Sequence, residues 1–173
     1  ILHIKYSYIV YLNRVSFKQK PIDFLLTFFD IITIIVYMKP YTHKVNYYET
    51  DKMGITHHSN YVRFMEEARV DFLDQIGWSF IDLENKGIAS PVINIECNFK
   101  KTTTFPDEIQ IEVYVQKLSA LKLTFGYIFT VNNEEVFTAS SSHCFLDLKG
   151  TPIILQKAFP EFYEELKKYV RTN

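Results

Sequence analysis

The sequence predicts an α+β fold in which a curved antiparallel sheet wraps around one long central helix. Residues 61–76 carry apolar side chains at a helical period, and several later runs alternate between apolar and polar side chains. No helical pattern separates the later runs, so neighbouring strands should pair antiparallel. Wrapping the sheet around the apolar face of the helix is the economical way to bury both.

Composition places the chain among globular proteins of ordinary charge. Its 173 residues are enough for one domain with its own core, and the formal charge of -1 gives no reason to expect nucleic acid as the main partner. Cys97 and Cys144 have neither the number nor the spacing of a disulfide framework or a metal site. Both lie in strand-like runs, where we expect buried free thiols. A reducing cytoplasm fits this pattern best.

The first 37 residues differ from the rest of the chain. Their apolar run, residues 22–37, is shorter than the roughly 20 residues of a membrane span and contains Asp23 and Asp30. No small-residue cleavage site follows it, so a signal peptide is a poor match. We therefore predict no transmembrane span. We expect the native protein to start at Met38, with residues 1–37 as an upstream extension. The alternative is an extra helix or interface segment.

The elements expected from residue 38 onward follow from periodicity, turn residues and caps. Ser59 and Asn60 stand where an N-cap would satisfy the first free N–H groups of the long helix, and Gly77 ends it. Asn132-Asn133 is typical of a tight hairpin turn, and Pro160 opens the last helix. In chain order we expect strand 41–48, the long helix, a short helix or turn 79–85, strands 90–101, 109–116, 121–131 and 136–148, and helix 161–170.

The polar turn before the long helix is the strongest candidate for chemistry. It carries Asp51, Gly54, His57 and His58, and Asp51 lies just upstream of the helix N-terminus. The free amides and positive dipole end of a helix favour developing negative charge. A reaction at a carbonyl group needs an attacking group and a donor to the carbonyl oxygen, and this turn offers both.

The stretch YYETDKMGITHHSNYVRFMEEARVDFL resembles hot-dog-fold acyl-CoA thioesterases of the 4-hydroxybenzoyl-CoA thioesterase type. The likeness is particularly to their bacterial Tol-Pal-associated branch and covers about residues 38–170 by matching elements. The matching residues are Tyr48, Asp51, Gly54, His58, Asn60 and Tyr61. The resemblance implies a hot-dog domain over residues 38–173 that hydrolyses acyl-CoA. It implies no metal and no cofactor, with coenzyme A bound as part of the substrate.

The resemblance also implies roles for three residues of the turn. Asp51 would be the catalytic carboxylate, acting as nucleophile or as general base for water; the alternative is an Asp that only caps the turn. Gly54 would let the backbone turn and approach the substrate closely, or be an ordinary turn glycine. The backbone N–H of His58 would donate to the oxyanion and its imidazole would orient substrate or water, with a capping or surface histidine as an equal alternative.

Further residues are expected at the substrate. Tyr48 and Tyr61 belong to the matching motif, and Asn60 does too, although capping the helix is its better interpretation. Met53 departs from the family, where small residues are commoner, and is expected to alter the wall of the acyl pocket. Lys100 and Lys101 could meet the phosphates of coenzyme A; an ordinary charged strand end is equally compatible with them.

Three other polar residues have a less specific interpretation. Glu66 and Glu67 merit attention because another hot-dog branch uses a helix glutamate as its catalytic carboxylate. Here they share a charged helix face with Arg63, which favours a solvated or interface role. His143, in the run ASSSHCF, is expected to be a strand residue whose hydrogen bonds are satisfied.

Two rival functions stay open. A hot-dog hydratase or dehydratase would need a His and acid pair for proton transfer at the acyl chain. A non-catalytic acyl-carrier or membrane-complex adaptor would bind without turnover, and acyl carrier protein is an alternative carrier for the substrate itself. The family pairs two sheets edge to edge and builds its site across the subunit interface, so the resemblance implies a homodimer or a homotetramer.

Overall fold

The computed structural model describes residues 38–171, and the segment from Met38 onward forms one compact unit. The prediction of an upstream extension over residues 1–37 lies outside the described residues. Within the described part, no helix is both long and apolar enough to cross a membrane.

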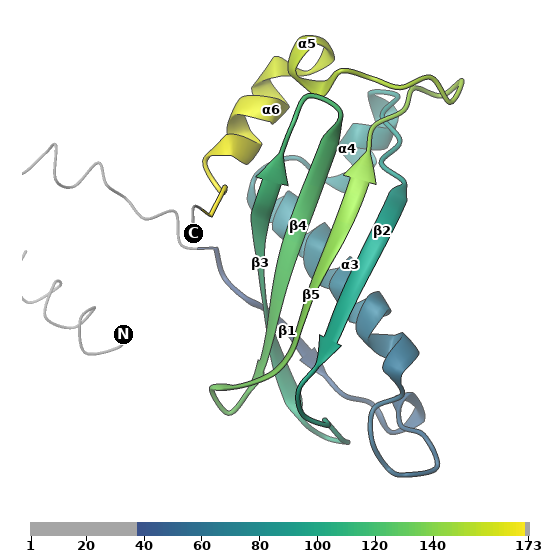
Figure 1. Cartoon of the computed structure of the whole chain (residues 1–173), viewed down its shortest axis with the longest axis vertical. Coiled ribbons are helices and arrows are strands. Elements are labelled where there is room, and N and C mark those ends of the chain that lie inside the picture. The colour runs from purple at the N-terminus through teal and green to yellow at the C-terminus, as the bar shows by residue number, and fades with distance from the viewer. Residues whose placement is uncertain (1–37, 172–173) are drawn as a thin grey trace, which may run out of the picture. The chain divides into compact units, whose positions relative to one another are not determined.

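One five-stranded antiparallel sheet organises this unit (Figure 1). Its order is β1-β3-β4-β5-β2, so the first two strands lie at the two edges. The strands are β1 (Tyr41–Lys44), β2 (Val92–Phe99), β3 (Glu108–Leu118), β4 (Lys122–Val131) and β5 (Glu134–Cys144). The helical elements are the 3-10 turn η1 (Tyr47–Glu49) and the helices α3 (His58–Gln75), α4 (Phe80–Asn85), α5 (Leu155–Ala158) and α6 (Pro160–Lys167). The predicted α+β fold is confirmed.

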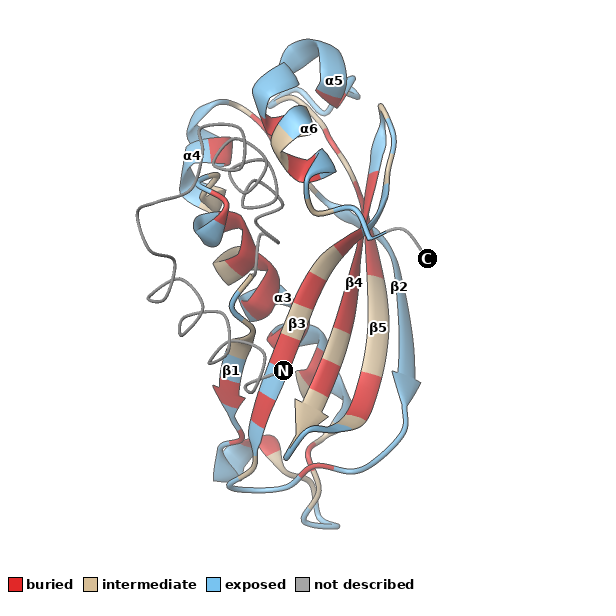
Figure 2. Cartoon of the chain, turned by 90° about the vertical axis from the view of Figure 1, so that its left-hand side faces the viewer, coloured by how far each residue is buried: buried red, intermediate tan, exposed pale blue. Residues whose placement is uncertain are grey.

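The core lies between the sheet and the apolar face of α3. Figure 1 shows α3 behind the strands, and in Figure 2 buried bands alternate with more exposed ones along β3. Ile109, Ile111, Val113 and Val115 are the buried positions of β3, which is the period of two that the sequence predicts. The aromatic rings interlock across the layers: the α3 ring of Phe72 meets that of Phe125 on β4 edge to face.

Two predicted turns are confirmed. Asn132 and Asn133 connect β4 to β5 and both have left-handed backbone angles, with φ values of 51° and 66°. Two successive left-handed residues match the twist of the flanking strands, and asparagine tolerates this conformation better than most residues do. Pro160 occupies the first turn of α6, where its missing N–H leaves no hydrogen bond unmade.

Three local predictions are wrong. The strand expected over residues 41–48 ends at Lys44, and residues 47–49 form the turn η1. Helix α3 begins at His58, and its N-cap is His57, whose ring nitrogen Nδ1 accepts from the Ser59 N–H at 3.4 Å; Ser59 and Asn60 are already helical. Cys97, expected to be buried, is exposed, and Cys144 is half-buried; both are free thiols. The periodicity of β2 gave no indication that this strand would lie at an open edge of the sheet.

The two edges of the sheet differ strongly. Strand β1 has 4 residues, whereas β2 has 8 and all of them are exposed. Helix α3 packs mainly against β1 and β3, and it meets β2 through the rings of Tyr61 and Phe99. Apolar side chains of β2 remain in solvent, with Ile93 exposed by 51% and Phe99 by 52%.

Candidate active site

A cleft of about 390 Å³ opens where the turn before α3 meets the end of β2. Three segments far apart in the sequence form it: the turn, the first residues of α3 and the stretch that follows β2. Six of the predicted site residues line it together: Asp51, Met53, His58, Tyr61, Lys100 and Lys101.

The Asp51 turn is closed by its own backbone and side chain. The Asp51 N–H donates to the Ile55 carbonyl at 2.8 Å, and Asp51 Oδ1 accepts from the Met53 N–H at 2.7 Å. Asp51 therefore caps the turn, as the alternative interpretation expected. Its second carboxylate oxygen has no hydrogen-bond partner within residues 38–171, and the residue lines the cleft. The carboxylate can cap the turn through one oxygen and face a substrate through the other.

Gly54 gives this turn its backbone conformation. Its φ of +77° is in the left-handed region that favours glycine. The Gly54 carbonyl accepts from the Thr104 hydroxyl at 2.6 Å, which joins the turn to the segment after β2. Gly54 itself is not among the residues that line the cleft. Its role in the turn is confirmed, while close approach to a substrate stays a prediction.

His58 brings a helix N-terminus to the same cleft. It is the first residue of α3, and within the described part of the chain its backbone N–H donates no hydrogen bond. The first amides of a helix have no intrahelical acceptor, so this donor can meet negative charge in the cleft. The exposed imidazole lies beside that of His57, with 4.2 Å between ring centroids. The predicted oxyanion donor is thus in a suitable position, and its role stays a prediction.

The floor of the cleft is a buried chain of hydroxyl groups. Tyr61 Oη lies 2.9 Å from Thr103 Oγ1, which lies 2.7 Å from Thr56 Oγ1. Burial raises the pKa of the Tyr61 phenol above its usual value, so the group stays protonated at neutral pH. The Tyr61 ring also meets the Phe99 ring edge to face, with 5.2 Å between centroids. Tyr61 and Phe99 give the cleft an aromatic wall.

Lys100 and Lys101 lie at the cleft, and both already form ion pairs. Their ammonium groups pair with the carboxylates of Glu135 and Glu134 in the β4–β5 hairpin. Ion pairs this exposed are individually weak, so phosphate groups could compete for the lysines. Phosphate recognition by these lysines stays a prediction.

Two other predicted substrate residues lie away from this cleft. Tyr48 is 80% exposed on η1 and does not line the cleft. Asn60 points its amide at the Glu49 carbonyl, to which it donates at 2.8 Å. Asn60 therefore fastens η1 to the start of α3, and the prediction that it caps the helix is wrong.

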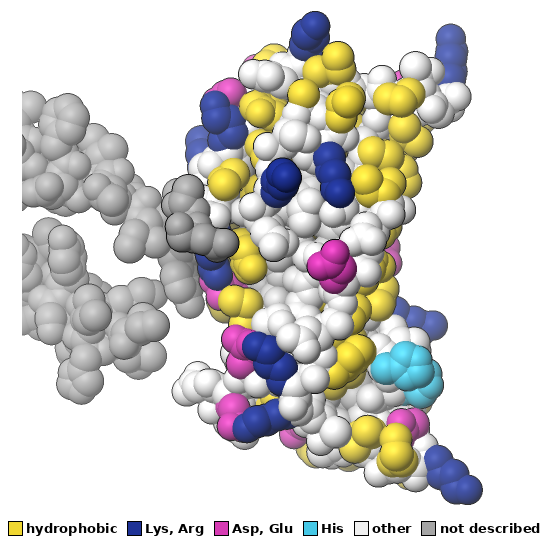
Figure 3. All heavy atoms as spheres, in the orientation of Figure 1, with side chains coloured by type: hydrophobic (Ala, Val, Ile, Leu, Met, Phe, Trp, Pro, Cys, Tyr) yellow, Lys and Arg dark blue, Asp and Glu magenta, His cyan; other side chains and the backbone are white. Residues whose placement is uncertain are grey.

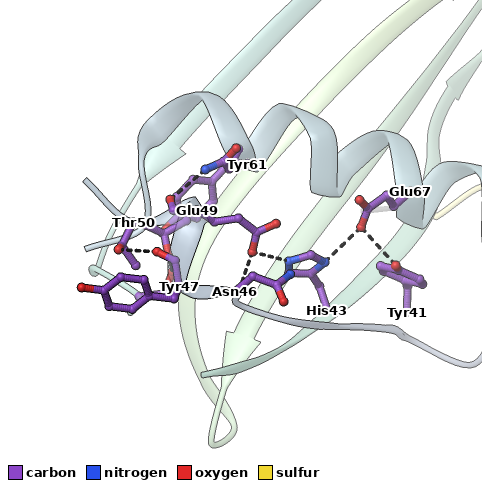
Figure 4. Close-up of polar contacts among 11 residues, drawn as sticks. Tyr41, His43, Asn46, Tyr47, Glu49, Thr50, Tyr61 and Glu67 are labelled. Atoms are coloured by element: carbon purple, nitrogen blue, oxygen red, sulfur yellow. Dashed lines mark hydrogen bonds and ion pairs between the residues drawn. The ribbon is translucent and has the colours of Figure 1, made fainter. Parts of the chain in front are cut away.

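Part of the site and of its support was not predicted from the sequence. Ile55, Thr56, Phe99 and Thr102 also line the cleft. Below the turn, His43 of β1 lies between the carboxylates of Glu49 and Glu67 (Figure 4). Strand periodicity was an available signal, because Tyr41 and His43 fall on one face of β1.

The remaining polar predictions have mixed outcomes. Glu66 and Glu67 are both exposed, as expected of a solvated face, and neither lines the cleft. Glu67 also binds Tyr41 and His43. His143 is fully buried on β5, and its Nε2 lies 2.8 Å from the Ser141 hydroxyl, which confirms a satisfied strand residue. No group of three or more His, Cys, Asp or Glu side chains within residues 38–171 could hold a metal ion.

Comparison with known proteins identifies the family. Residues 45–169, more than half of the chain, match the thioesterase-like superfamily. The chain belongs to this superfamily. Membership confirms the predicted enzyme class, a thioesterase of the hot-dog fold.

Thioesterase-like relatives cover most of the chain. YneP of Bacillus subtilis, provisionally named an acyl-CoA thioesterase, is 35% identical over 130 residues, which are 72% of this chain and 94% of YneP. The long-chain acyl-CoA thioesterase FadM of Escherichia coli is 27% identical over 130 residues, 74% of this chain and 96% of FadM. The crystal structure of DHNA-CoA thioesterase from Staphylococcus aureus matches with a TM-score of 0.72 and 32% identity, covering 75% of this chain and 89% of that one.

Proposed function

We propose that the protein hydrolyses acyl-CoA thioesters to a free acid and coenzyme A. One observation carries the proposal: a half-exposed carboxylate, Asp51, and the helix N-terminal residue His58, whose amide is unpaired within residues 38–171, line one cleft. The names of YneP and FadM support this substrate class. The six matched motif residues favour the Tol-Pal-associated branch of the 4-hydroxybenzoyl-CoA thioesterase type as the finer assignment.

In the proposed reaction the thioester carbonyl oxygen accepts a hydrogen bond from the His58 N–H. Asp51 takes a proton from water as the water oxygen attacks the carbonyl carbon, and negative charge collects on the carbonyl oxygen. When the tetrahedral intermediate collapses, the C–S bond breaks, and the departing thiolate receives the proton. Direct attack by Asp51 would instead form an anhydride that water then cleaves.

We also propose that two copies associate through β2. The strand is long, antiparallel to its neighbour and exposed along its whole length, and apolar side chains gather along the margin of the molecule where β2 lies (Figure 3). Pairing two such edges would cover Ile93 and Phe99, and would put a second subunit beside the cleft. A dimer, or a tetramer of two dimers, is the expected assembly, measured by light scattering.

Free-thiol release from short, long and aromatic acyl-CoAs tests the proposed activity. We expect Asp51→Asn to lower kcat about a hundredfold or more, because the amide cannot accept the proton. Asp74→Asn, an exposed position near the end of α3, is the matched control and should keep full turnover.

Other results would redirect the assignment. Turnover that survives Asp51→Asn would move the catalytic carboxylate elsewhere, with Glu66 and Glu67 tested next. If the wild type releases no thiol, hydration of enoyl-CoA would indicate the hydratase, and binding of acyl carrier protein without turnover would indicate the adaptor. The cytoplasmic location stays a prediction, tested by cell fractionation.

A further inference from the structure

A buried histidine lies next to the candidate active site without touching the cleft. His43 Nε2 is 3.0 Å from Glu49 Oε2, and His43 Nδ1 is 3.0 Å from Glu67 Oε2 (Figure 4). Only 9% of the His43 side chain is exposed, and its ring stacks on Phe64 with 3.8 Å between centroids. Each ring nitrogen thus faces a carboxylate oxygen in a confined space.

The hydrogen-bonding chemistry of this cluster favours a charged ring. An ionised carboxylate only accepts hydrogen bonds, and a neutral imidazole has a single N–H to donate. Both contacts are hydrogen bonds only when the two ring nitrogens both carry protons. The other neighbours are donors as well: the Asn46 N–H donates to Glu49 Oε2 at 2.6 Å, and the Tyr41 hydroxyl donates to Glu67 Oε2 at 3.0 Å.

Tyr41 lies beside the carboxylates of the cluster and stays uncharged. Burial, the hydrogen bond to Glu67 and nearby carboxylates raise the pKa of its phenol to about 12. Tyr41 therefore stays a neutral donor and supplies no negative charge of its own. An imidazolium at His43 is the group that offsets the two carboxylates.

Glu49 connects this cluster to the catalytic turn. Its backbone carbonyl accepts from the His57 N–H and from the Asn60 side-chain amide, both at 2.8 Å. Glu49 is thus held by its carboxylate to His43 and by its carbonyl to the residues on both sides of the helix start. Asp51 follows two positions later in the chain. Any shift of Glu49 would move Asp51 relative to the first amides of α3.

We propose that His43, as an imidazolium held between Glu49 and Glu67, is a positioning residue that fixes Asp51 relative to the His58 amide. It acts through Glu49 and η1 and touches neither substrate nor water in the cleft. The catalytic consequence rests on the proposed thioesterase function. Displacement of a reacting group by about 1 Å can cost a hundredfold in rate, so small shifts of the turn are sufficient.

The kinetic test compares His43→Gln with His143→Gln. Glutamine keeps a polar side chain but cannot carry the proposed charge of His43, and His143 is a matched buried histidine outside the cluster. We expect His43→Gln to lower kcat about tenfold to a hundredfold with KM changed less than about threefold, while His143→Gln keeps kcat at temperatures where both remain folded. Equal loss of kcat in both variants, or none in His43→Gln, would overturn the proposal.

A double variant separates positioning from a simple loss of packing. In His43→Gln/Glu49→Gln the two amides can hydrogen bond without charges, so kcat should recover above that of either single variant. Additive losses of kcat would show that the two side chains act independently, which contradicts positioning through the contact between them.

Two measurements read the cluster without any turnover. Imidazole ¹⁵N chemical shifts should show both His43 nitrogens protonated in the wild type at pH 7, and one of them unprotonated after Glu49→Gln. Amide hydrogen exchange of residues 51–58 should quicken in His43→Gln and not in His143→Gln. A neutral His43 ring in the wild type, or unchanged exchange, would overturn the proposal even if the protein proved not to be a thioesterase.

Discussion

Two buried histidines, His43 and His143, have opposite electrostatic surroundings. His43 on β1 lies between two carboxylates, whereas His143 on β5 faces the guanidinium of Arg69, with 3.3 Å between Nδ1 and Nη1. Burial, and then the charge of Arg69, lower the pKa of His143 to about 4, so its ring is neutral at pH 7. The same side chain is thus suited to opposite charge states in one small domain, because its neighbours decide which form is stable.

The contrast extends to the charges that each histidine meets. Arg69 is itself buried, and within residues 38–171 no carboxylate forms an ion pair with it. Its guanidinium lies over the Phe80 ring, 5.4 Å from the centroid, and the Ser141 hydroxyl occupies the other side of His143. A proton on His143 would therefore place two cations side by side. Carboxylates surround His43, whereas burial and the Arg69 cation keep His143 neutral.

Removal of Glu49 has the largest expected effect and tests the difference between His43 and His143 most directly. Glu49→Ala leaves the His43 ring buried without its best-enclosed carboxylate and leaves the Asn46 N–H without its acceptor. We expect a loss of about 4 kcal/mol in the free energy of unfolding, because a buried charge becomes uncompensated. Urea unfolding at pH 7 measures it. A loss below about 1 kcal/mol would mean that the His43 ring is neutral in the folded protein.

Acid should destabilise the protein through His143. The unfolded chain protonates this residue near pH 6.5, and the folded chain only near pH 4. The neutral ring therefore favours the folded state fully above about pH 6.5, and we expect about 3 kcal/mol of this contribution to be lost as the pH falls toward 4. The difference between wild type and His143→Gln in unfolding free energy, followed from pH 7 to pH 4, measures it. A difference that does not vary with pH would contradict the neutral folded ring.

Replacement of Glu67 should cost less than that of Glu49. Its side chain is 44% exposed, so solvent can substitute for much of its interaction with His43 and Tyr41. We expect Glu67→Ala to lower the unfolding free energy by about 1 kcal/mol in the same urea experiment. A loss as large as that of Glu49→Ala would mean that the two carboxylates contribute equally to stability, whatever their difference in burial.

The smallest expected effect tests how much Arg69 contributes to the low pKa of His143. Arg69→Met removes a cation and fills a similar volume, and such replacements often leave stability nearly unchanged. We expect the pKa of His143 to rise above about 4 and to remain below 6.5, since burial is the larger cause. An NMR titration of the ring measures the pKa. No rise at all would exclude Arg69 as a contributor.

Features set by neighbouring residues in the chain were predictable. The helical period of α3, the left-handed Asn132-Asn133 turn and the Asp51 to Gly54 turn depend on local geometry, and each was found. Features set by distant segments were not. His43 meets carboxylates from η1 and α3, and Lys100 and Lys101 meet glutamates of the β4–β5 hairpin. The exposure of Cys97 depends on where α3 lies across the sheet, which no local pattern specifies.

The unequal edges of the sheet limit how far these molecules can assemble. An antiparallel edge can pair with a copy of itself about a two-fold axis, and pairing through β2 would consume the one long edge of each sheet. The outer borders of the resulting double sheet would be the two short β1 strands, with 4 residues each. So short a border is a poor template for another strand. With one long edge paired and one short edge left over, the proposed assembly would be a closed pair and not a fibre.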